Sequence, residues 1–267
     1  MKIDSCIFLH FPFKLHQVDK IAENMTDSFD KIPPATAVIH IDGQDESPWR
    51  QRFETIYKAL RRRIVLLDYP PGTRLDVAAL AKEFDVSRTP IRTVIQRLEN
   101  EGLAITRHGV GTSVTDVDVY QVRDVWSFRL QLAELIGRLN PRPGRVAVIE
   151  QLERLHDVCQ ALNSASPSRD FALVDVKLHD FKCNLIGNSN LLRTYDEMYY
   201  RSVRAWFLWV PRLDFEVEQA ALSADISQTM NAVRRDDVAA VGYITRNALS
   251  EGLYRLDTLI EQGGDET

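Results

Sequence analysis

The 267-residue sequence has few cysteines and no long apolar run, and both absences limit what the chain can be. Its three cysteines, Cys6, Cys159 and Cys183, form no CxxC pair, which favours a reducing compartment such as the cytoplasm. No apolar run is long enough to span a membrane, so a membrane partner is not expected. The sequence also lacks a glycine-rich phosphate loop and a nucleophile with a matched base, which argues against an enzyme.

Charge is distributed unevenly along the chain. The whole chain has a formal net charge of −5, yet residues 50–115 contain 12 Lys and Arg against 7 Asp and Glu. A basic segment inside an acidic chain is the electrostatic footprint of a site for a polyanion such as nucleic acid.

The most informative stretch, residues 87–103, reads as one helix with a basic outer face. Ser87 is suited to cap its start through the hydroxyl, Pro90 is tolerated in the first turn, and Gly102 is suited to end it. The apolar residues that recur at helical spacing are Ile91, Val94, Ile95 and Leu98. The residues left on the other side are Arg88, Thr89, Arg92 and Gln96. Guanidinium, hydroxyl and amide groups are suited to phosphates and base edges in a DNA major groove.

The flanking segments complete a small domain around this helix. The expected elements are helices 49–67 and 77–84 before it and strands 103–107 and 112–115 after it. Only Asp85 and Val86 link the second helix to the basic helix, which is the spacing of a helix-turn-helix. The two strands form a hairpin, or wing, with residues 108–111 at its tip. The segment is therefore predicted to be a winged helix-turn-helix.

Several motifs in this domain are similar to those of a known family. They are Pro71–Leu75, Leu80–Ala81, Val86–Arg92, Leu98–Leu103 and the glycine-containing wing. On these motifs, residues 54–115 resemble the winged helix-turn-helix of GntR-family bacterial transcription regulators. The resemblance implies a homodimer that binds double-stranded operator DNA. The DNA-binding residues that it implies are Arg74, Arg88, Thr89, Arg92, His108 and Gly109. Ala78 stands where some relatives have an arginine, which implies one DNA contact fewer.

The remainder of the chain is helical in pattern. The expected helices are 116–140, 145–162, 171–186, 191–210, 215–233 and 237–261. No strand pattern interrupts them, so we expect an antiparallel bundle of six or seven helices. The fold class is therefore mainly α, with an N-terminal winged helix-turn-helix and a C-terminal bundle. The expected domains are 49–115 for DNA binding and 116–267 for effector binding and dimerisation.

The bundle also carries motifs of the same family. They are Arg129-x-x-Leu132, Asp175–His179, Gly187–Leu191 and Ala232–Asp237. They resemble the ligand-sensing FCD domain of the FadR-type branch, which implies that a small effector, a carboxylate, binds in the bundle. In many relatives an Asp-x-x-x-His pair and two further histidines hold a divalent metal. Asp175 and His179 match the pair, but Ile226 and Ala248 occupy the two histidine positions and cannot be ligands.

The sequence therefore favours a pocket without a metal over a metal centre. Asp175 and His179 lie four residues apart and share a helix face, but two ligands leave most of a zinc-like shell unfilled. After a shift of register, the neighbouring residues Asp225 and Asn247 could replace the two missing histidine ligands.

In that pocket we expect Arg129, Asp175, His179 and Arg204 to contact the effector. Arginine and histidine would hold an organic anion by charge-assisted hydrogen bonds. Three alternatives stay open at this point. Asp175 and His179 could pair only with each other in a polar core, the bundle could serve dimerisation alone, or the same pair could support a metal-assisted hydrolase.

The first 48 residues fit neither domain. The acidic stretch with Pro33 and Pro34 is typical of a mobile extension, and Met25 is an alternative start. A second interpretation is an arm that docks on a partner subunit, with residues 38–41 as a short strand.

Overall fold

The computed structural model describes residues 47–117, 119–143, 146–166 and 168–263. The expectations for an N-terminal extension, a start at Met25 and a strand at 38–41 therefore lie outside the described residues. Within the described ranges, none of the helices combines the length and the apolar character that crossing a membrane requires.

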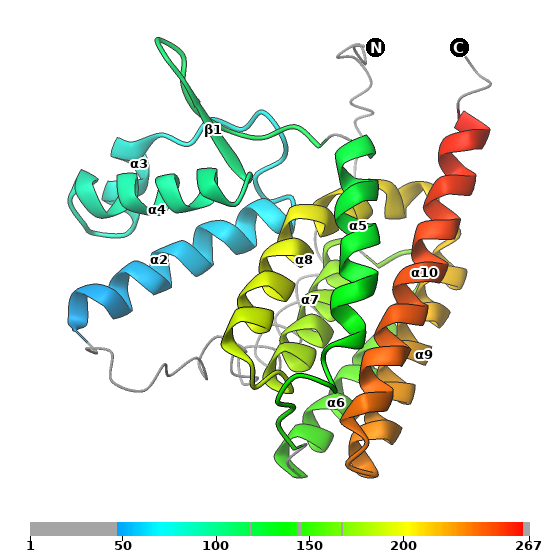
Figure 1. Ribbon diagram of the computed structural model, residues 1–267. Coiled ribbons are helices and arrows are strands. Elements are labelled where there is room, and N and C mark those ends of the chain that lie inside the picture. The colour runs from blue at the N-terminus through cyan, green and yellow to red at the C-terminus, as the bar shows by residue number, and fades with distance from the viewer. Residues whose placement is uncertain (1–46, 118, 144–145, 167, 264–267) are drawn as a thin grey trace. The chain divides into compact units, whose positions relative to one another are not determined.

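The N-terminal domain is a winged helix-turn-helix, as the sequence predicts (Figure 1). Its elements are α2 (Pro48–Val65), α3 (Val77–Glu83), α4 (Arg88–Asn100), β1 (Ala104–Arg107) and β2 (Gly111–Val114). The two strands are antiparallel, and their register pairs Ala104 with Val114 and Arg107 with Gly111. The segment before α3 extends this sheet, because Leu75 N–H donates to the Thr112 carbonyl at 2.9 Å.

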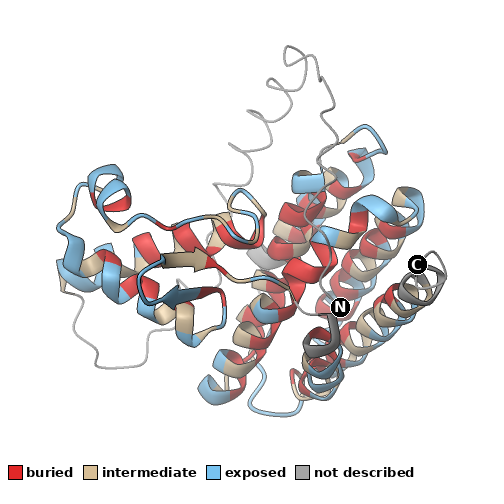
Figure 2. Ribbon diagram, turned by 90° about the horizontal axis from the view of Figure 1, so that it is seen from above, coloured by how far each residue is buried: buried red, intermediate tan, exposed pale blue. Residues whose placement is uncertain are grey.

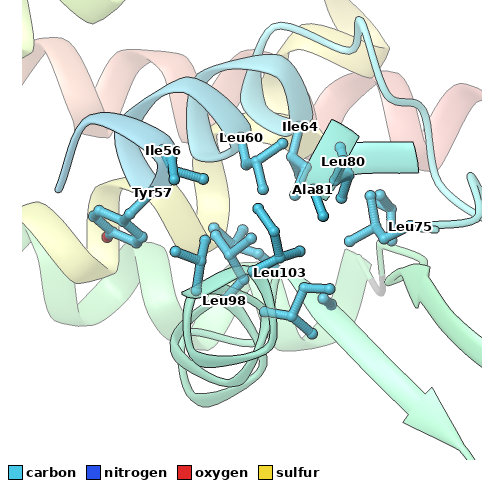
Figure 3. Packing of buried hydrophobic residues seen from close by; sticks show 14 residues of the cluster. Ile56, Tyr57, Leu60, Ile64, Leu75, Leu80, Ala81, Leu98 and Leu103 are labelled. Carbon is cyan, nitrogen blue, oxygen red and sulfur yellow. The ribbon is translucent and has the colours of Figure 1, made fainter. Parts of the chain in front are cut away.

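One apolar core holds these elements together (Figure 3). The stripe expected on α4 points into it, and Ile91, Val94 and Leu98 are fully buried there. Residues from α2 cover them, among them Leu60 and Ile64, which are also fully buried. Since the stripe faces the core, the opposite face of α4 is left to solvent.

The sequence predicts how α4 ends but not how its first turn is capped. Gly102 adopts φ +71°, and Leu103 N–H donates to the Leu98 carbonyl at 2.8 Å, which is the expected glycine ending. Ser87 occupies the N-cap position with an extended backbone, but its side chain makes no capping hydrogen bond. The expected hydroxyl cap is therefore wrong, and only the position of the helix start is confirmed.

The C-terminal domain is a bundle whose buried faces point inward (Figure 2). Its helices are α5 (Val119–Glu134), α6 (Val146–Ala161), α7 (Ser168–Asn184), α8 (Ser189–Trp209), α9 (Phe215–Arg234) and α10 (Val238–Gly263), with a short 3-10 turn, η2 (Val210–Arg212), after α8. Helix α5 packs against α8 and α10, and α6 packs against α9. The described residues thus contain the six helices that the sequence predicts.

Helix α5 ends earlier than expected. The sequence predicts a helix to Asn140, but α5 stops at Glu134 and Asn140 adopts φ +51°. The chain after α5 lies against the start of α10, since a Cβ added at Gly137 would lie 2.3 Å from the Ala239 Cα atom. This close backbone approach is a tertiary contact, so the helical spacing in the sequence does not reveal it.

Candidate functional sites

The first candidate site is the outer face of α4. Arg88, Thr89 and Arg92 are all exposed on it, in the N-terminal half of the helix. Neither arginine forms an ion pair with a carboxylate of the described residues. The guanidinium groups are therefore free to contact an external anion, and the positive end of the helix dipole lies beside them.

The wing supplies the rest of this surface. His108 and Gly109 are exposed at the tip of the hairpin, where Gly109 adopts φ +76°. Arg74 is exposed too, and its guanidinium lies beside the wing, 3.7 Å from where a Cβ at Gly111 would stand. The structure thus leaves all six predicted DNA-contacting residues accessible to a ligand. Ala78, on α3, is exposed but offers only a methyl group.

The second candidate site is a cavity of about 170 Å³ inside the bundle, lined by α5, α7, α8, α9 and α10. Three of the four predicted effector residues, Arg129, Asp175 and His179, line it. Arg204 does not. Its guanidinium donates to the Thr115 carbonyl at 3.1 Å and to the Thr115 hydroxyl at 2.7 Å, where the wing ends.

Arg129 is the cavity residue with the least satisfied charge. It is 5% exposed, it donates to Ser202 Oγ at 3.0 Å, and its Nε has no partner among the described residues. Burial lowers the pKa of the Arg129 guanidinium, with Tyr195 and Tyr199 opposing that shift. Burying a cation without a carboxylate partner costs free energy. Binding of an anion beside Arg129 would offset part of that cost.

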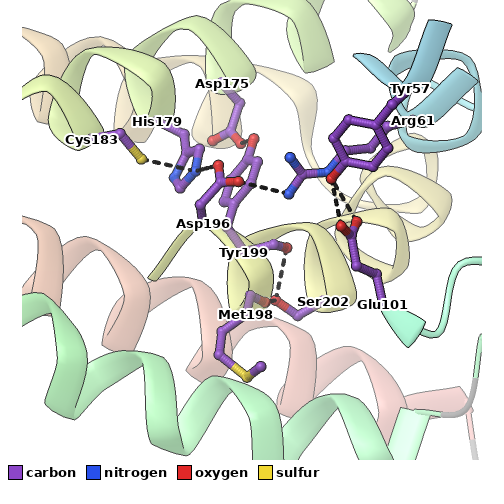
Figure 4. Close-up of polar contacts among 10 residues, drawn as sticks. All are labelled: Tyr57, Arg61, Glu101, Asp175, His179, Cys183, Asp196, Met198, Tyr199 and Ser202. Carbon is purple, nitrogen blue, oxygen red and sulfur yellow. Dashed lines mark hydrogen bonds and ion pairs between the residues drawn. The ribbon is translucent and has the colours of Figure 1, made fainter. Parts of the chain in front are cut away.

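Asp175 and His179 do not contact each other, which contradicts the alternative that they pair only with one another. Asp175 accepts a hydrogen bond of 2.7 Å from the Tyr199 hydroxyl (Figure 4), and burial raises the pKa of its carboxyl. The His179 ring stacks on Tyr199, with 3.6 Å between ring centroids, and lies 5.1 Å from the centroid of Tyr195. Burial lowers the pKa of His179 to about 4, so the imidazole is neutral near pH 7.

Two ion pairs that the sequence does not reveal also lie in the cavity wall. Lys182 contacts both carboxylate oxygens of Asp225 at 2.7 and 2.8 Å, and Arg255 contacts Glu218 at 2.6 and 3.0 Å. Each pair joins residues far apart in sequence, and no local pattern marks it. Because these cations are paired, Arg129 is left as the cavity cation with the strongest demand for an anion.

The donor set does not fit the four-ligand metal site of the family resemblance. Ile226 is fully buried and apolar, and Ala248 lines the cavity without a donor atom. The register-shifted donors Asp225 and Asn247 do line the cavity, but Asp225 is held by Lys182. Asp175 directs one oxygen to Tyr199.

A buried arginine of α2 reaches the bundle next to this cavity (Figure 4). Arg61 is 6% exposed, donates to Asp196 Oδ2 at 2.8 Å, and lies 3.4 Å above the ring centroid of Tyr200. The sequence holds a signal for it, because Arg61 follows Tyr57 by four residues and Leu60 by one, on the buried face of α2.

Two family models match the chain. "Bacterial regulatory proteins, gntR family" matches residues 52–114, and "FCD domain" matches residues 124–251. The first covers the winged domain from α2 to β2, and the second covers the bundle from α5 into α10.

Named relatives and solved structures agree with these matches. The HTH-type transcriptional regulator YdhC of Bacillus subtilis is 26% identical over 51% of this chain and 61% of its own length. The transcriptional repressor RspR of Escherichia coli is 29% identical over 56% of this chain and 68% of its own length. The chain therefore spans about three-fifths to two-thirds of these two relatives.

Among solved structures, E. coli McbR/YncC superposes with a TM-score of 0.65 at 14% identity, over 78% of this chain and 98% of that one. A transcriptional regulator from Rhodococcus sp. RHA1 superposes with a TM-score of 0.57 at 18% identity, over 78% of this chain and 98% of that one. At these identities the likeness concerns the fold alone.

Proposed function

The chain belongs to the GntR family of bacterial regulatory proteins and carries an FCD domain, and from this we propose that it regulates transcription by binding operator DNA under the control of a small organic anion. That family is one of transcriptional regulators and not an enzyme class. The observation that carries the proposal is the pair of exposed arginines without ion-pair partners, Arg88 and Arg92, at the start of α4. The family's mode of action places such a helix in the DNA major groove.

The DNA part of the proposal is tested by titration of the protein with DNA from upstream of its own gene. Arg88→Ala and Arg92→Ala should each weaken binding about tenfold or more and reduce the dependence on salt, because each removes one contact to a phosphate or a base. Arg201→Ala is the matched control, since Arg201 is exposed on α8 in the bundle. Equal losses in all three variants would contradict the role of α4.

We further propose that the protein acts as a two-fold dimer on two half-sites, and that the effector changes the fit of the two winged domains to their spacing. The mass of the protein in solution and the length of the protected DNA measure this. A monomer that protects a single half-site would contradict it.

The effector part rests on Arg129. We propose that an organic carboxylate enters the cavity and pairs with this guanidinium, beside Asp175 and the free Nδ1 edge of His179. Carboxylates that bind should stabilise the fold, by about 2.7 kcal/mol at a concentration roughly a hundredfold above Kd. A thermal-shift screen with small mono- and dicarboxylates measures this.

Arg129→Met is the decisive variant for this cavity. It should abolish the stabilisation by a carboxylate without unfolding the protein, because Ser202 Oγ keeps its hydrogen bond to the Met198 carbonyl. A response that survives in Arg129→Met would exclude this residue as the anion site. If no carboxylate stabilises the native protein, the bundle serves dimerisation alone.

A further inference from the structure

Three metal-ligating groups converge beside the cavity, around one imidazole nitrogen. His179 and Cys183 lie one turn apart on α7, and Asp196 faces them from α8 (Figure 4). His179 Nε2 is 3.3 Å from Cys183 Sγ and 3.1 Å from Asp196 Oδ1. The three donor atoms all lie within 4.8 Å of one another, and the thiol and the imidazole are buried.

Protons alone cannot satisfy this cluster. Asp196 is held as a carboxylate by Arg61 and can only accept hydrogen bonds. If Nε2 of His179 carries the proton, it donates to Asp196, but it then cannot accept from the Cys183 thiol, and the buried Nδ1 is left without a donor. If Nδ1 carries the proton, Nε2 and Asp196 Oδ1 face each other as two acceptors 3.1 Å apart. Each tautomer leaves a buried polar contact unmade, which costs free energy.

We propose that His179 Nε2, Cys183 Sγ and Asp196 Oδ1 form a binding site for a transition-metal ion of the zinc class. An imidazole, a thiolate and a carboxylate are the three ligand types that Zn²⁺ takes in proteins. Tetrahedral bonds of about 2.0–2.3 Å separate neighbouring donors by roughly 3.3–3.5 Å, close to the two separations found here. The bound ion accepts a lone pair from each donor and thereby removes the conflict between them.

The proton balance is simple. On binding, the Cys183 thiol loses its proton to solvent and becomes the thiolate ligand. The imidazole keeps its single proton on Nδ1, and Asp196 is already ionised through its pairing with Arg61. One proton is released for each ion bound.

This site differs from the metal set of the family resemblance. It shares only His179 with that set. Cys183 and Asp196 are not among the residues that line the cavity, whereas Asp175 lines it and bonds to Tyr199 instead. Arg61 of α2 donates to the second oxygen, Oδ2, so it orients the carboxylate as an outer-shell partner and leaves Oδ1 for the ion.

The test uses the full chain, stripped with a chelator, kept reduced and titrated with Co²⁺ as a spectroscopic substitute for Zn²⁺. We expect one equivalent of Co²⁺ to bind, with the thiolate-to-cobalt charge-transfer band in the near ultraviolet and the visible bands of a tetrahedral ion. Zn²⁺ should displace Co²⁺ and raise the melting temperature. Absence of stoichiometric binding, or binding without the charge-transfer band, overturns the proposal.

Variants assign the band to its ligands. Cys183→Ser should abolish it and weaken the affinity about a hundredfold or more, since even outer-shell changes cost about 10–100-fold. The matched control is Cys159→Ser, which removes the other buried cysteine of the bundle and should keep the band. Asp175→Asn should also keep it. A band that persists in Cys183→Ser, or that Asp175→Asn removes, contradicts the assignment.

A further variant guards against misfolding of Cys183→Ser. The chain has three cysteines, so the double variant Cys6→Ser, Cys159→Ser leaves Cys183 as the single thiol. The charge-transfer band in this protein would come from Cys183 without any change to the proposed site. Its loss there, with the fold intact by circular dichroism, would overturn the proposal. None of these readouts depends on DNA or on a carboxylate effector.

Discussion

Asp76 and Ser87 hold the same position at the starts of α3 and α4, but their side chains have different roles. Asp76 Oδ1 accepts from the backbone N–H groups of Ala78 and Ala79 at 2.7 and 2.9 Å. These bonds stabilise the ionised form and lower the pKa of Asp76. The hydroxyl of Ser87 makes no such bond, although serine is a favoured capping residue. The identity of a capping residue therefore does not reveal its energetic contribution.

We predict that Asp76→Ala lowers the melting temperature at neutral pH clearly more than Ser87→Ala does. The pKa of Asp76 is lower in the folded than in the unfolded protein, so its contribution to stability is present above the ordinary value of 3.8 and is lost as pH falls through the folded pKa. The difference between Asp76→Ala and the native protein should therefore shrink in acid. Thermal unfolding followed by circular dichroism, at neutral pH and again at a pH below 3.8, measures these differences. Equal effects of Asp76→Ala and Ser87→Ala at neutral pH would contradict the prediction.

At the scale of elements, the contact between α5 and α10 depends on missing side chains. A Cβ added at Gly242 of α10 would lie 2.8 Å from the Ala133 carbonyl oxygen of α5. Gly252 lies further along the same helix, and a Cβ there would meet the Trp206 ring at 3.8 Å and the Arg255 guanidinium at 4.0 Å, which are ordinary contacts. Both glycines lie within α10, but only Gly242 is packed too closely against another backbone to admit a Cβ atom.

We predict that Gly242→Ala destabilises the protein by about 1–3 kcal/mol, because the two helix backbones must separate to admit a methyl group. Gly252→Ala should instead stabilise it by about 0.5–1 kcal/mol, because alanine restricts the unfolded chain and favours the helix. Urea unfolding of both variants measures the free energy. Effects of the same sign would contradict a role for the close α5–α10 approach at Gly242.

At the scale of the whole described chain, two ion pairs connect the winged domain to the bundle, and they differ in burial. Arg61 and Asp196 have side chains only 7% and 19% exposed. Asp68 and Arg169 have side chains 33% and 44% exposed, with 2.8 Å between Arg169 Nε and Asp68 Oδ1. An exposed pair contributes little, whereas removing one partner of a buried pair leaves the other charge uncompensated.

We predict that Arg61→Met lowers the free energy of unfolding by about 3–5 kcal/mol. Arg169→Ala should cost at most about 1 kcal/mol, since solvent screens its partner. We also expect calorimetry to show one transition for the native protein and two for Arg61→Met, because the winged domain and the bundle lose their buried ion pair. A variant that melts as one unit with native stability would mean that Arg61 does not hold the domains together.

The sequence alone determines the elements and the fold class. Helix positions follow from apolar residues that recur every three or four positions. Because this spacing is local, it can be recognised without the tertiary structure. The face of α4 that carries Arg88 and Arg92 follows in the same way, because the stripe from Ile91 to Leu98 must be buried. The end of α5 and the unused hydroxyl of Ser87 do not follow, since each depends on neighbours in space.

Only the tertiary structure decides which polar residues share a site. Arg129 and Arg204 have the same side chain and the same prospect of lining the pocket, yet one lines the cavity and the other binds Thr115. Likewise, His179 on α7 contacts Asp196 on the neighbouring helix α8 and does not contact Asp175 on its own helix. The direction of a side chain depends on how helices are rotated and packed against each other. That rotation is set by contacts between residues distant in sequence, which no local pattern records.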